Sequence, residues 1–246
     1  ANVSLLQIQG PKSSALVAKI FGEHILDLRY YWLASVKFNG IDLIISRTGW
    51  SGELGYELYL SDYEKGSFLF NEIMKRGESF SLAAGSVNQA RRIEAGILSW
   101  GVEMSQEENP YEVNLGRLVE FTDGGKFIGR DAALHYSKQD QVKGLVGLKM
   151  MPPAIESNEK PWLIFNGENV IGKLTSVAYS PRLKFNIGLG LVCKQFTKLG
   201  TKLLVQGCDE NYDAEVVPIP FLEKRQMSNA KELALEFNQL NKERGN

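Results

Sequence analysis

The chain has 246 residues, which is long enough for a substantial hydrophobic core and for more than one domain. Its formal net charge of −1 predicts no basic surface for nucleic acid or an anionic membrane, and no apolar run approaches the ~20 residues of a membrane helix. Two cysteines, Cys193 and Cys208, form neither a CxxC motif nor a disulfide framework, so we expect a reducing compartment, the cytoplasm.

The first part of the chain predicts alternating strands and helices. Residues 3–9 are typical of a buried strand, and Pro11 suits the first turn of the helix that follows. Two strands near 29–38 and 41–47 are joined at Asn39-Gly40, which is a strong hairpin dipeptide. With a further strand and helix after them, this order predicts an α+β layer in which helices cover one side of an antiparallel sheet.

A glycine-rich segment at 46–59 separates two of these strands. Its glycines at 49, 52 and 55 allow positive φ angles and the close approach of a flat ligand. In the strand at 56–60, Tyr56 faces one side, whereas Glu57 and Tyr59 face the other. A carboxylate beside an aromatic ring at such a loop suits a heteroaromatic ring with N–H donors. The alternative is a long hairpin loop with a solvated glutamate.

Two helices are predicted next. Ser61-Asp62-Tyr63-Glu64 matches a capping box and begins a helix that ends near Gly77. A second helix runs from about Ser86 to Trp100. Its polar stripe suits a wall next to a ligand, although Arg92 in that stripe could instead pair with a carboxylate of the fold. The first helix has an apolar face of Tyr63, Phe70, Ile73 and Met74; the second has a core face of Ala90, Ile93, Ile97 and Trp100 and a polar stripe of Asn88, Arg92, Ala95 and Ser99.

The character of the chain changes from about Leu145. Short apolar strands separated by Gly, Asn and Pro turns predict a small β-barrel or sandwich, and the polar segment 136–142 is the natural boundary. The strands are expected at 145–150, 162–165, 169–175, 187–193, 202–206 and 214–218. After Phe221 the chain is charged, and Asn229 with Glu232 could cap a last helix. The apolar residues of that helix are Leu233, Leu235, Phe237 and Leu240.

Five motifs resemble, in the same order, those of the folate-dependent aminomethyltransferase family, whose founding member is the T-protein of the glycine cleavage system. The glycine-rich segment at 46–59 is the first. The others are Arg92-Ile93-Glu94-Ala95-Gly96, Asn109-Pro110-Tyr111-Glu112, Phe127-Ile128-Gly129-Arg130, and a C-terminal pattern of Thr175-Ser176, Tyr179-Ser180-Pro181 and Asn186-Ile187-Gly188. The resemblance implies a ferredoxin-like α/β folate-binding domain at 1–140 and a small C-terminal β-barrel at 141–225, with a helical tail at 226–246.

The resemblance also implies tetrahydrofolate as the cofactor. Glu57 stands at the family position that accepts two N–H bonds from the pterin ring, and such charge-assisted bonds are directional. Trp50 occupies the position of an aromatic residue that packs against the folate. Asn88 and Arg117 replace an arginine and a tryptophan of the T-protein, and Arg117 is a candidate partner for the glutamate tail. The predicted cofactor-binding residues are Trp50, Tyr56, Glu57, Asn88, Arg92 and Arg117, and the predicted substrate-binding residues are Tyr59 and Tyr179.

Three features resemble the dimethylsulfoniopropionate demethylase branch of the family more than the T-protein: Trp50, Asn88 and the unbroken spacing from Glu57 to Asn88. This branch moves a methyl group from a sulfonium to tetrahydrofolate. A sulfonium is a good leaving group, so holding N5 in line with the methyl carbon could supply much of the rate. The rings of Trp50, Tyr56 and Tyr59 could shelter the cation. The expected partner is a small-molecule methyl donor, and a homodimer is a further expectation.

Three alternatives stay open. A true aminomethyltransferase takes its one-carbon unit from a lipoyl-bound aminomethyl group, and Asn88 argues against it. The chain could also be the folate domain of a sarcosine or dimethylglycine demethylating system. The third alternative is a relative that binds folate as a scaffold or repair protein without transferring a methyl group. Such relatives usually have a cysteine-containing motif in place of Arg92-Ile93-Glu94-Ala95-Gly96, and this sequence has none.

The chain opens at Ala1 without Met, directly before a strand and Gln9-Gly10-Pro11-Lys12. In the family this strand and motif lie well inside the chain. We therefore expect a fragment that lacks the N-terminal segment and, with it, the catalytic aspartate of the T-protein, so that no catalytic residue is assigned. His24 and His135 stand alone without metal-ligand spacing, and no metal site is expected.

Overall fold

The computed structural model describes residues 3–122, 125–223 and 228–244. These form two compact units, Ala1–Val87 with Lys224–Asn246, and Asn88–Glu223. Each unit has a hydrophobic core of its own. The boundaries between these units differ from the domain boundaries predicted at 140 and 225. The predicted domain boundaries stay a prediction.

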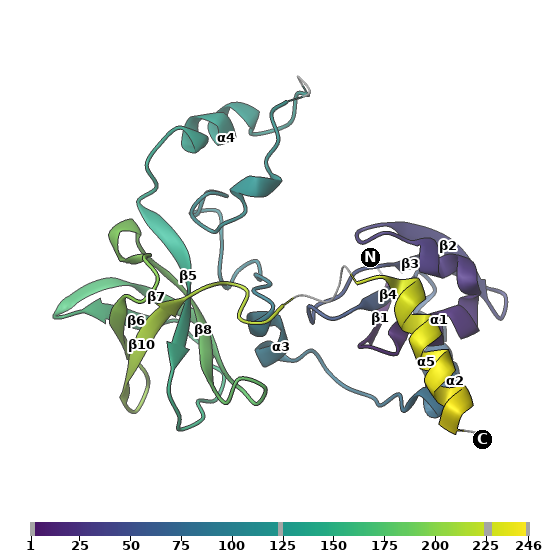
Figure 1. The fold of residues 1–246 in the computed structure, drawn as a ribbon. Coiled ribbons are helices and arrows are strands. Elements are labelled where there is room, and N and C mark those ends of the chain that lie inside the picture. Colours follow the sequence, from purple (N-terminus) through teal and green to yellow (C-terminus); the bar gives the residue numbers. More distant parts are fainter. Residues whose placement is uncertain (1–2, 123–124, 224–227, 245–246) are drawn as a thin grey trace. The chain divides into compact units, whose positions relative to one another are not determined.

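The first unit contains a four-stranded antiparallel sheet in the order β1-β4-β3-β2 (Figure 1). Its strands are β1 (Ser4–Gln9), β2 (Leu33–Phe38), β3 (Ile41–Ser46) and β4 (Gly55–Leu60). The β2–β3 hairpin turns at Asn39 and Gly40, whose φ angles of 49° and 79° are the left-handed values that this dipeptide favours. The predicted strands and the hairpin are confirmed, with two differences. The strand predicted near 29–38 begins only at Leu33, and β1, predicted as a buried strand, leaves Leu5 47% exposed.

Helices cover one face of this sheet. They are α1 (Ser13–Phe21), α2 (Gly66–Gly77) and α5 (Ala230–Arg244), with short 3-10 helices η1 (Glu23–Asp27), η2 (Tyr63–Lys65) and η3 (Glu78–Phe80). Alternate strand residues such as Ile45 and Leu58 are buried in one core with Leu16 of α1 and Leu69 of α2. The opposite face of the sheet carries Glu57. The predicted α+β layer is therefore confirmed.

The predicted start of α2 is wrong. Residues 63–65 form the 3-10 helix η2, whose N-cap residue is Asp62 rather than the predicted Ser61, and neither Asp62 nor Lys65 makes a side-chain cap bond. The buried face of α2, which begins at Gly66, also differs from the predicted one. Leu69 and Ile73 are buried, whereas Tyr63 and Phe70 are 53% and 41% exposed.

The capped C-terminal helix is confirmed as α5. The side-chain oxygen of Asn229 accepts from the backbone N–H of Lys231 at 3.1 Å and of Glu232 at 3.4 Å. Phe237 stacks on Phe80, with ring centroids 5.0 Å apart. Of the four apolar residues expected on this helix, Leu235 and Leu240 are more than half exposed. The tail is thus held to the first unit by a narrow apolar stripe.

A closed six-stranded barrel dominates the second unit, in the order β10-β5-β8-β7-β6-β9 (Figure 1). Its strands are β5 (Lys143–Met150), β6 (Trp162–Asn166), β7 (Asn169–Ser180), β8 (Phe185–Cys193), β9 (Lys202–Gln206) and β10 (Asn211–Val217). All neighbours pair antiparallel. The α+β class with a C-terminal β-barrel is confirmed.

Shorter elements precede the barrel: α3 (Gln89–Glu94), η4 (Gly116–Leu118) and α4 (Arg130–Ser137), with η5 (Lys194–Phe196) between β8 and β9. The helix predicted from Ser86 to Trp100 is therefore too long. It ends at Glu94, and Gly96 just after its C-cap has a φ of +61° and a Cβ position 2.2 Å from Cγ2 of Ile219. Trp100, predicted as core, is 64% exposed.

Candidate functional site

The carboxylate of Glu57 is held by three neutral donors on the face of the first sheet opposite α1 and α2. The strand register sets Glu57 beside Gln7 of β1 and Ser46 of β3. Gln7 Nε2 donates to Glu57 Oε1 at 3.0 Å, and the Tyr59 hydroxyl donates to Oε2 at 3.1 Å. Thr48 Oγ1 also donates to Oε2. Because the single hydroxyl proton of Thr48 points to Glu57, Ser46 is the donor in its hydrogen bond with Thr48.

Glu57 is half-buried, and within the described residues it forms no ion pair. A carboxylate has about four acceptor positions, so three donors leave one of them open. Glu57 is thus fixed in orientation and has no cationic partner among the described residues, which suits a ligand that brings N–H donors or a positive charge.

Gln9 fixes the glycine-rich loop beside this carboxylate. Its Nε2 donates to the carbonyl of Thr48 at 3.2 Å, and its Oε1 accepts from Ser51 Oγ at 2.8 Å. The amide lies directly on two glycines: a Cβ on Gly49 would be 2.1 Å from Gln9 Oε1, and a Cβ on Gly55 would be 2.3 Å from its Cδ. These two positions therefore need glycine because a side chain, rather than a ligand, approaches them closely.

Among the other predicted residues of the first unit, Tyr59 and Trp50 are both half-buried; Tyr59 lies beside Glu57 and Trp50 in the glycine-rich loop. Burial raises the pKa of the Tyr59 phenol, and the charge of Glu57 raises it further. Tyr59 is therefore a neutral donor at ordinary pH. Tyr56 points to the opposite face, where it is fully buried in the core, and burial raises its pKa to about 12. A side chain on that face does not share a ligand with Glu57, so we remove Tyr56 from the candidate site.

Arg92 of the second unit belongs to a buried polar network. Its Nη1 donates to Glu103 Oε2 at 2.9 Å, in an ion pair whose side chains are 2% and 0% exposed. The remaining bonds run from Nη2 to Glu103 Oε1 and Ser176 Oγ, from Nη1 to the Ile97 carbonyl, and from Nε to Gln89 Oε1. An arginine has five N–H donors, and here the protein uses all five. Arg92 therefore has no donor left for folate, and the alternative of an ion pair within the fold replaces its predicted cofactor role.

Glu94 of the same motif is also buried, and it binds the same barrel strand. It accepts from Ser180 Oγ at 2.6 Å and from Arg182 Nε at 3.0 Å. Ser176 and Ser180 both belong to β7, so the two charged residues of the Arg92-Ile93-Glu94-Ala95-Gly96 motif attach α3 to the barrel. This motif maintains the fold of the second unit.

The other predicted residues of the second unit have surface positions. Asn88 caps α3, with its side-chain oxygen accepting from the backbone N–H of Arg91 at 3.1 Å. Arg117 is exposed in η4, and Tyr179 is half-buried on β7. Their predicted contacts with folate or substrate stay predictions.

Sequence reasoning missed the residues that position the charged groups. Gln7 and Glu57 are 50 positions apart, and only the β1–β4 register brings them together. Glu103 lies in a stretch without helical or strand period, so its pairing with Arg92 had no local signal. For the donors of Glu57, the sequence offered one signal: Thr48 lies within the glycine-rich motif, two residues after Ser46.

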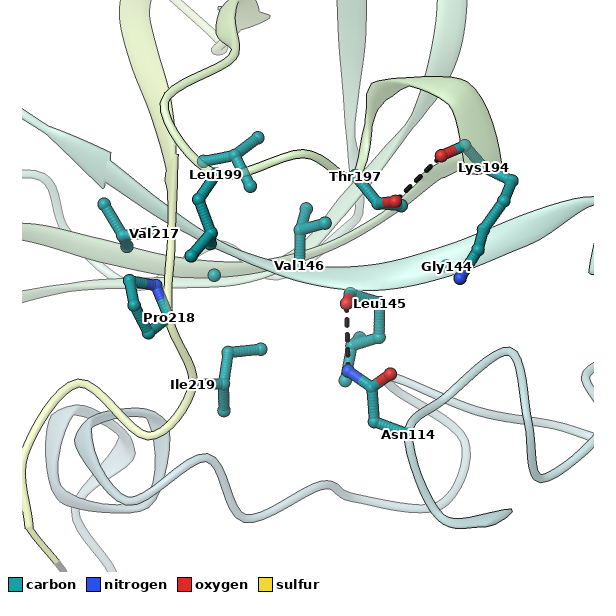
Figure 2. Close-up of a pocket in the computed structure, with 12 residues that line it drawn as sticks. Asn114, Gly144, Leu145, Val146, Lys194, Thr197, Leu199, Val217, Pro218 and Ile219 are labelled. Carbon is teal, nitrogen blue, oxygen red and sulfur yellow. Dashed lines mark hydrogen bonds between the residues drawn. The ribbon is translucent and has the colours of Figure 1, made fainter.

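A cavity of about 270 Å³ opens in the second unit, between β5 and the segments 194–199 and 216–219 (Figure 2). Asn114 Nδ2 donates to the Leu145 carbonyl at its edge, at 3.0 Å. A second cavity of about 280 Å³ lies in the first unit between the β1–α1 turn and residues 80–83. No predicted site residue lines either cavity.

In the parts of the chain that the structure describes, no helix is long and apolar enough to cross a membrane. Over the same residues, no cluster of three or more His, Cys, Asp or Glu side chains could hold a metal ion. Cys193 and Cys208 are free thiols.

Two family profiles match the chain. The one described as the GCVT N-terminal domain covers residues 1–123, and the one described as the glycine cleavage T-protein C-terminal barrel domain covers residues 143–223. The second range contains all six strands of the barrel.

Similar proteins point to the same family. The dimethylsulfoniopropionate demethylase of Ruegeria pomeroyi is 31% identical over 85% of this chain and 56% of its own length. The aminomethyltransferase of Caldanaerobacter subterraneus is also 31% identical, over 90% of this chain and 59% of its own length. The crystal structure of the glycine cleavage system aminomethyltransferase T from Bartonella henselae has the same fold, with a TM-score of 0.77 and 23% identity over 92% of this chain and 61% of that one. The chain thus spans between 56% and 61% of the length of these proteins.

Proposed function

The chain belongs to the glycine cleavage T-protein family, and from this premise we propose that it binds the pterin ring of tetrahydrofolate on Glu57 and takes part in one-carbon transfer to that cofactor. Tetrahydrofolate, when bound, supplies N5 as the acceptor of the one-carbon unit. The role of Glu57 is to orient the ring.

The single observation that carries the proposal is the environment of the Glu57 carboxylate. Its three donors are neutral, so its charge is not cancelled by a cation of the described residues. A pterin presents two neighbouring N–H groups, and a fixed carboxylate can accept both in a directional, bidentate contact. Trp50, half-buried in the neighbouring loop, offers a flat apolar surface for a ring.

For the one-carbon donor we favour a sulfonium such as dimethylsulfoniopropionate, with 5-methyltetrahydrofolate as the product. The supporting observations are Tyr59 beside the carboxylate and Trp50 in the glycine-rich loop, whose aromatic rings suit a cationic donor, and the neutral Asn88. The similarity to a dimethylsulfoniopropionate demethylase and to an aminomethyltransferase is equal at 31%, so an aminomethyl donor is the second candidate. We also propose a cytoplasmic location, which suits two free thiols.

Calorimetric titration of tetrahydrofolate into the full-length protein tests the cofactor. Glu57→Gln should lose binding, whereas Glu64→Gln, which removes the same charge from an exposed position of the same unit, should keep it. Equal binding by wild type and Glu57→Gln would contradict the proposal.

The donor is tested separately on the same protein. Dimethylsulfoniopropionate and tetrahydrofolate should together give 5-methyltetrahydrofolate. Transfer only from a lipoyl-bound aminomethyl group would instead identify an aminomethyltransferase.

A further inference from the structure

The two oxygens of Glu57 are not equally available in the ligand-free site. Oε1 accepts only from Gln7, whereas Oε2 accepts from both Thr48 and Tyr59. Each carboxylate oxygen has about two acceptor positions. A ligand with two parallel N–H donors needs one position on each oxygen, and on Oε2 both are already taken.

We propose that Gln7 and Thr48 are positioning residues that stay on Glu57 when the ligand binds, and that the hydroxyl of Tyr59 holds the place of the second ligand N–H on Oε2 and is released from it. This inference rests on the proposed function, because it assigns the acceptor positions of the same carboxylate. Tyr59 then becomes free to contact the bound molecules only after the pterin has bound.

Thr48 is the better-fixed donor of the two on Oε2. Its hydroxyl accepts from Ser46, which is buried, and its carbonyl accepts from Gln9. Withdrawal of Thr48 would break this chain of bonds, which ties three segments of the unit together. Tyr59 donates to Glu57 at 3.1 Å from the end of a long half-buried side chain, and its hydroxyl also has the hydroxyls of Ser46 and Thr48 beside it. Rotation of its ring releases the hydroxyl and leaves the loop in place.

The neutral state of Tyr59 makes it suitable for this exchange. Burial and the charge of Glu57 both raise the pKa of the phenol, so at neutral pH the group is a donor without charge. One neutral O–H donor on Oε2 is then replaced by one N–H donor of the ligand. The number of hydrogen bonds to the carboxylate is conserved on Oε2 and rises on Oε1.

The test compares three variants for tetrahydrofolate affinity. Tyr59→Phe removes the donor that leaves, so its affinity should equal or exceed that of the wild type. Thr48→Val removes a donor that stays and should weaken binding roughly tenfold or more, as expected for a hydrogen bond to a charged group. Thr48→Ser keeps the hydroxyl and should restore affinity to near the wild-type value. Thermal unfolding of each variant checks that it is folded.

A second measurement follows the Tyr59 hydroxyl directly, by NMR of protein labelled with ¹³Cζ-tyrosine. The Tyr59 signal, assigned by its absence in Tyr59→Phe, should shift on saturation with tetrahydrofolate in the wild type. In Glu57→Gln it should already be displaced without ligand.

The outcomes separate the two proposals. If Tyr59→Phe loses as much affinity as Thr48→Val, or if the Tyr59 signal stays in place at saturation, the exchange is wrong although folate binding stands. If Thr48→Ser fails to restore affinity in a folded protein, the positioning role of Thr48 is wrong. If the wild type and Glu57→Gln bind tetrahydrofolate equally well, both the proposed function and the exchange at Glu57 are wrong.

Discussion

Removal of Arg92 should destabilise the protein without a direct effect on the ligand. In Arg92→Met the carboxylate of Glu103 stays buried, at 0% exposure, and loses both guanidinium donors. It keeps the backbone N–H of Ser99 at 2.7 Å and the hydroxyls of Ser176 and Thr175. An uncompensated buried charge of this kind costs about 3–5 kcal/mol.

A double-mutant cycle isolates the pair from its surroundings. Arg92→Met combined with Glu103→Leu removes both charges, and apolar replacement of a buried ion pair is often neutral or stabilising. Here Ser99 and Ser176 lose partners as well, so we expect the double variant to recover only part of the loss. The coupling energy should be about 2–3 kcal/mol, at the upper end of values for contacting residues.

Urea unfolding followed by far-ultraviolet circular dichroism measures these free energies. Lys202→Met serves as the control, because it breaks an exposed ion pair with Glu215 in the same unit and should leave the unfolding midpoint unchanged. A loss below about 1 kcal/mol in Arg92→Met would refute the argument from burial. Intact stability together with weaker folate binding would return Arg92 to the cofactor site.

Two further predictions concern the first unit. Gly55→Ala should destabilise it by about 1–3 kcal/mol in the same urea assay, because the new Cβ displaces the Gln9 amide from its bonds to the loop. The control is Gly85→Ala, which should be neutral or slightly stabilising because no atom lies within 4 Å of its Cβ position. Burial raises the pKa of the Tyr56 phenol from 10.0 in the unfolded chain to about 12 in the folded protein, so the unfolded state loses its proton first as the pH rises. The free energy of unfolding should therefore fall by about 1.4 kcal/mol per pH unit between these two values. Tyr56→Phe should abolish that slope and keep or raise stability at neutral pH, since among the described residues the buried hydroxyl has no hydrogen-bond partner; an unchanged slope would assign it to other groups.

Local signals predicted most of the fold. Asn39-Gly40 specifies its turn within two residues, and the barrel strands are short apolar runs between turn residues. The end of α3 was predicted too late, although Gly96 is itself a local stop signal. The apolar spacing that suggested a longer helix continues to Trp100, and what stops the helix is Gly96 packed against Ile219, more than a hundred residues later.

The candidate site was predictable only in part. The alternation along β4 correctly separated Glu57 from Tyr56, because it is a property of any strand. The same pattern does not specify the donors of Glu57, since Gln7 reaches it through pairing between distant strands. Arg92 was misplaced for a related reason. A polar stripe on a helix looks the same whether it meets a ligand or a buried carboxylate such as Glu103.

The alternation along β4 also limits how this protein can change during evolution. Glu57 lies between two residues, Tyr56 and Leu58, that are fully buried. Insertion or deletion of one residue next to Glu57 would turn the carboxylate into the apolar core and expose the aromatic ring. The ligand specificity of this sheet can therefore be altered by substitutions, but changes in strand length are tolerable only in steps of two residues.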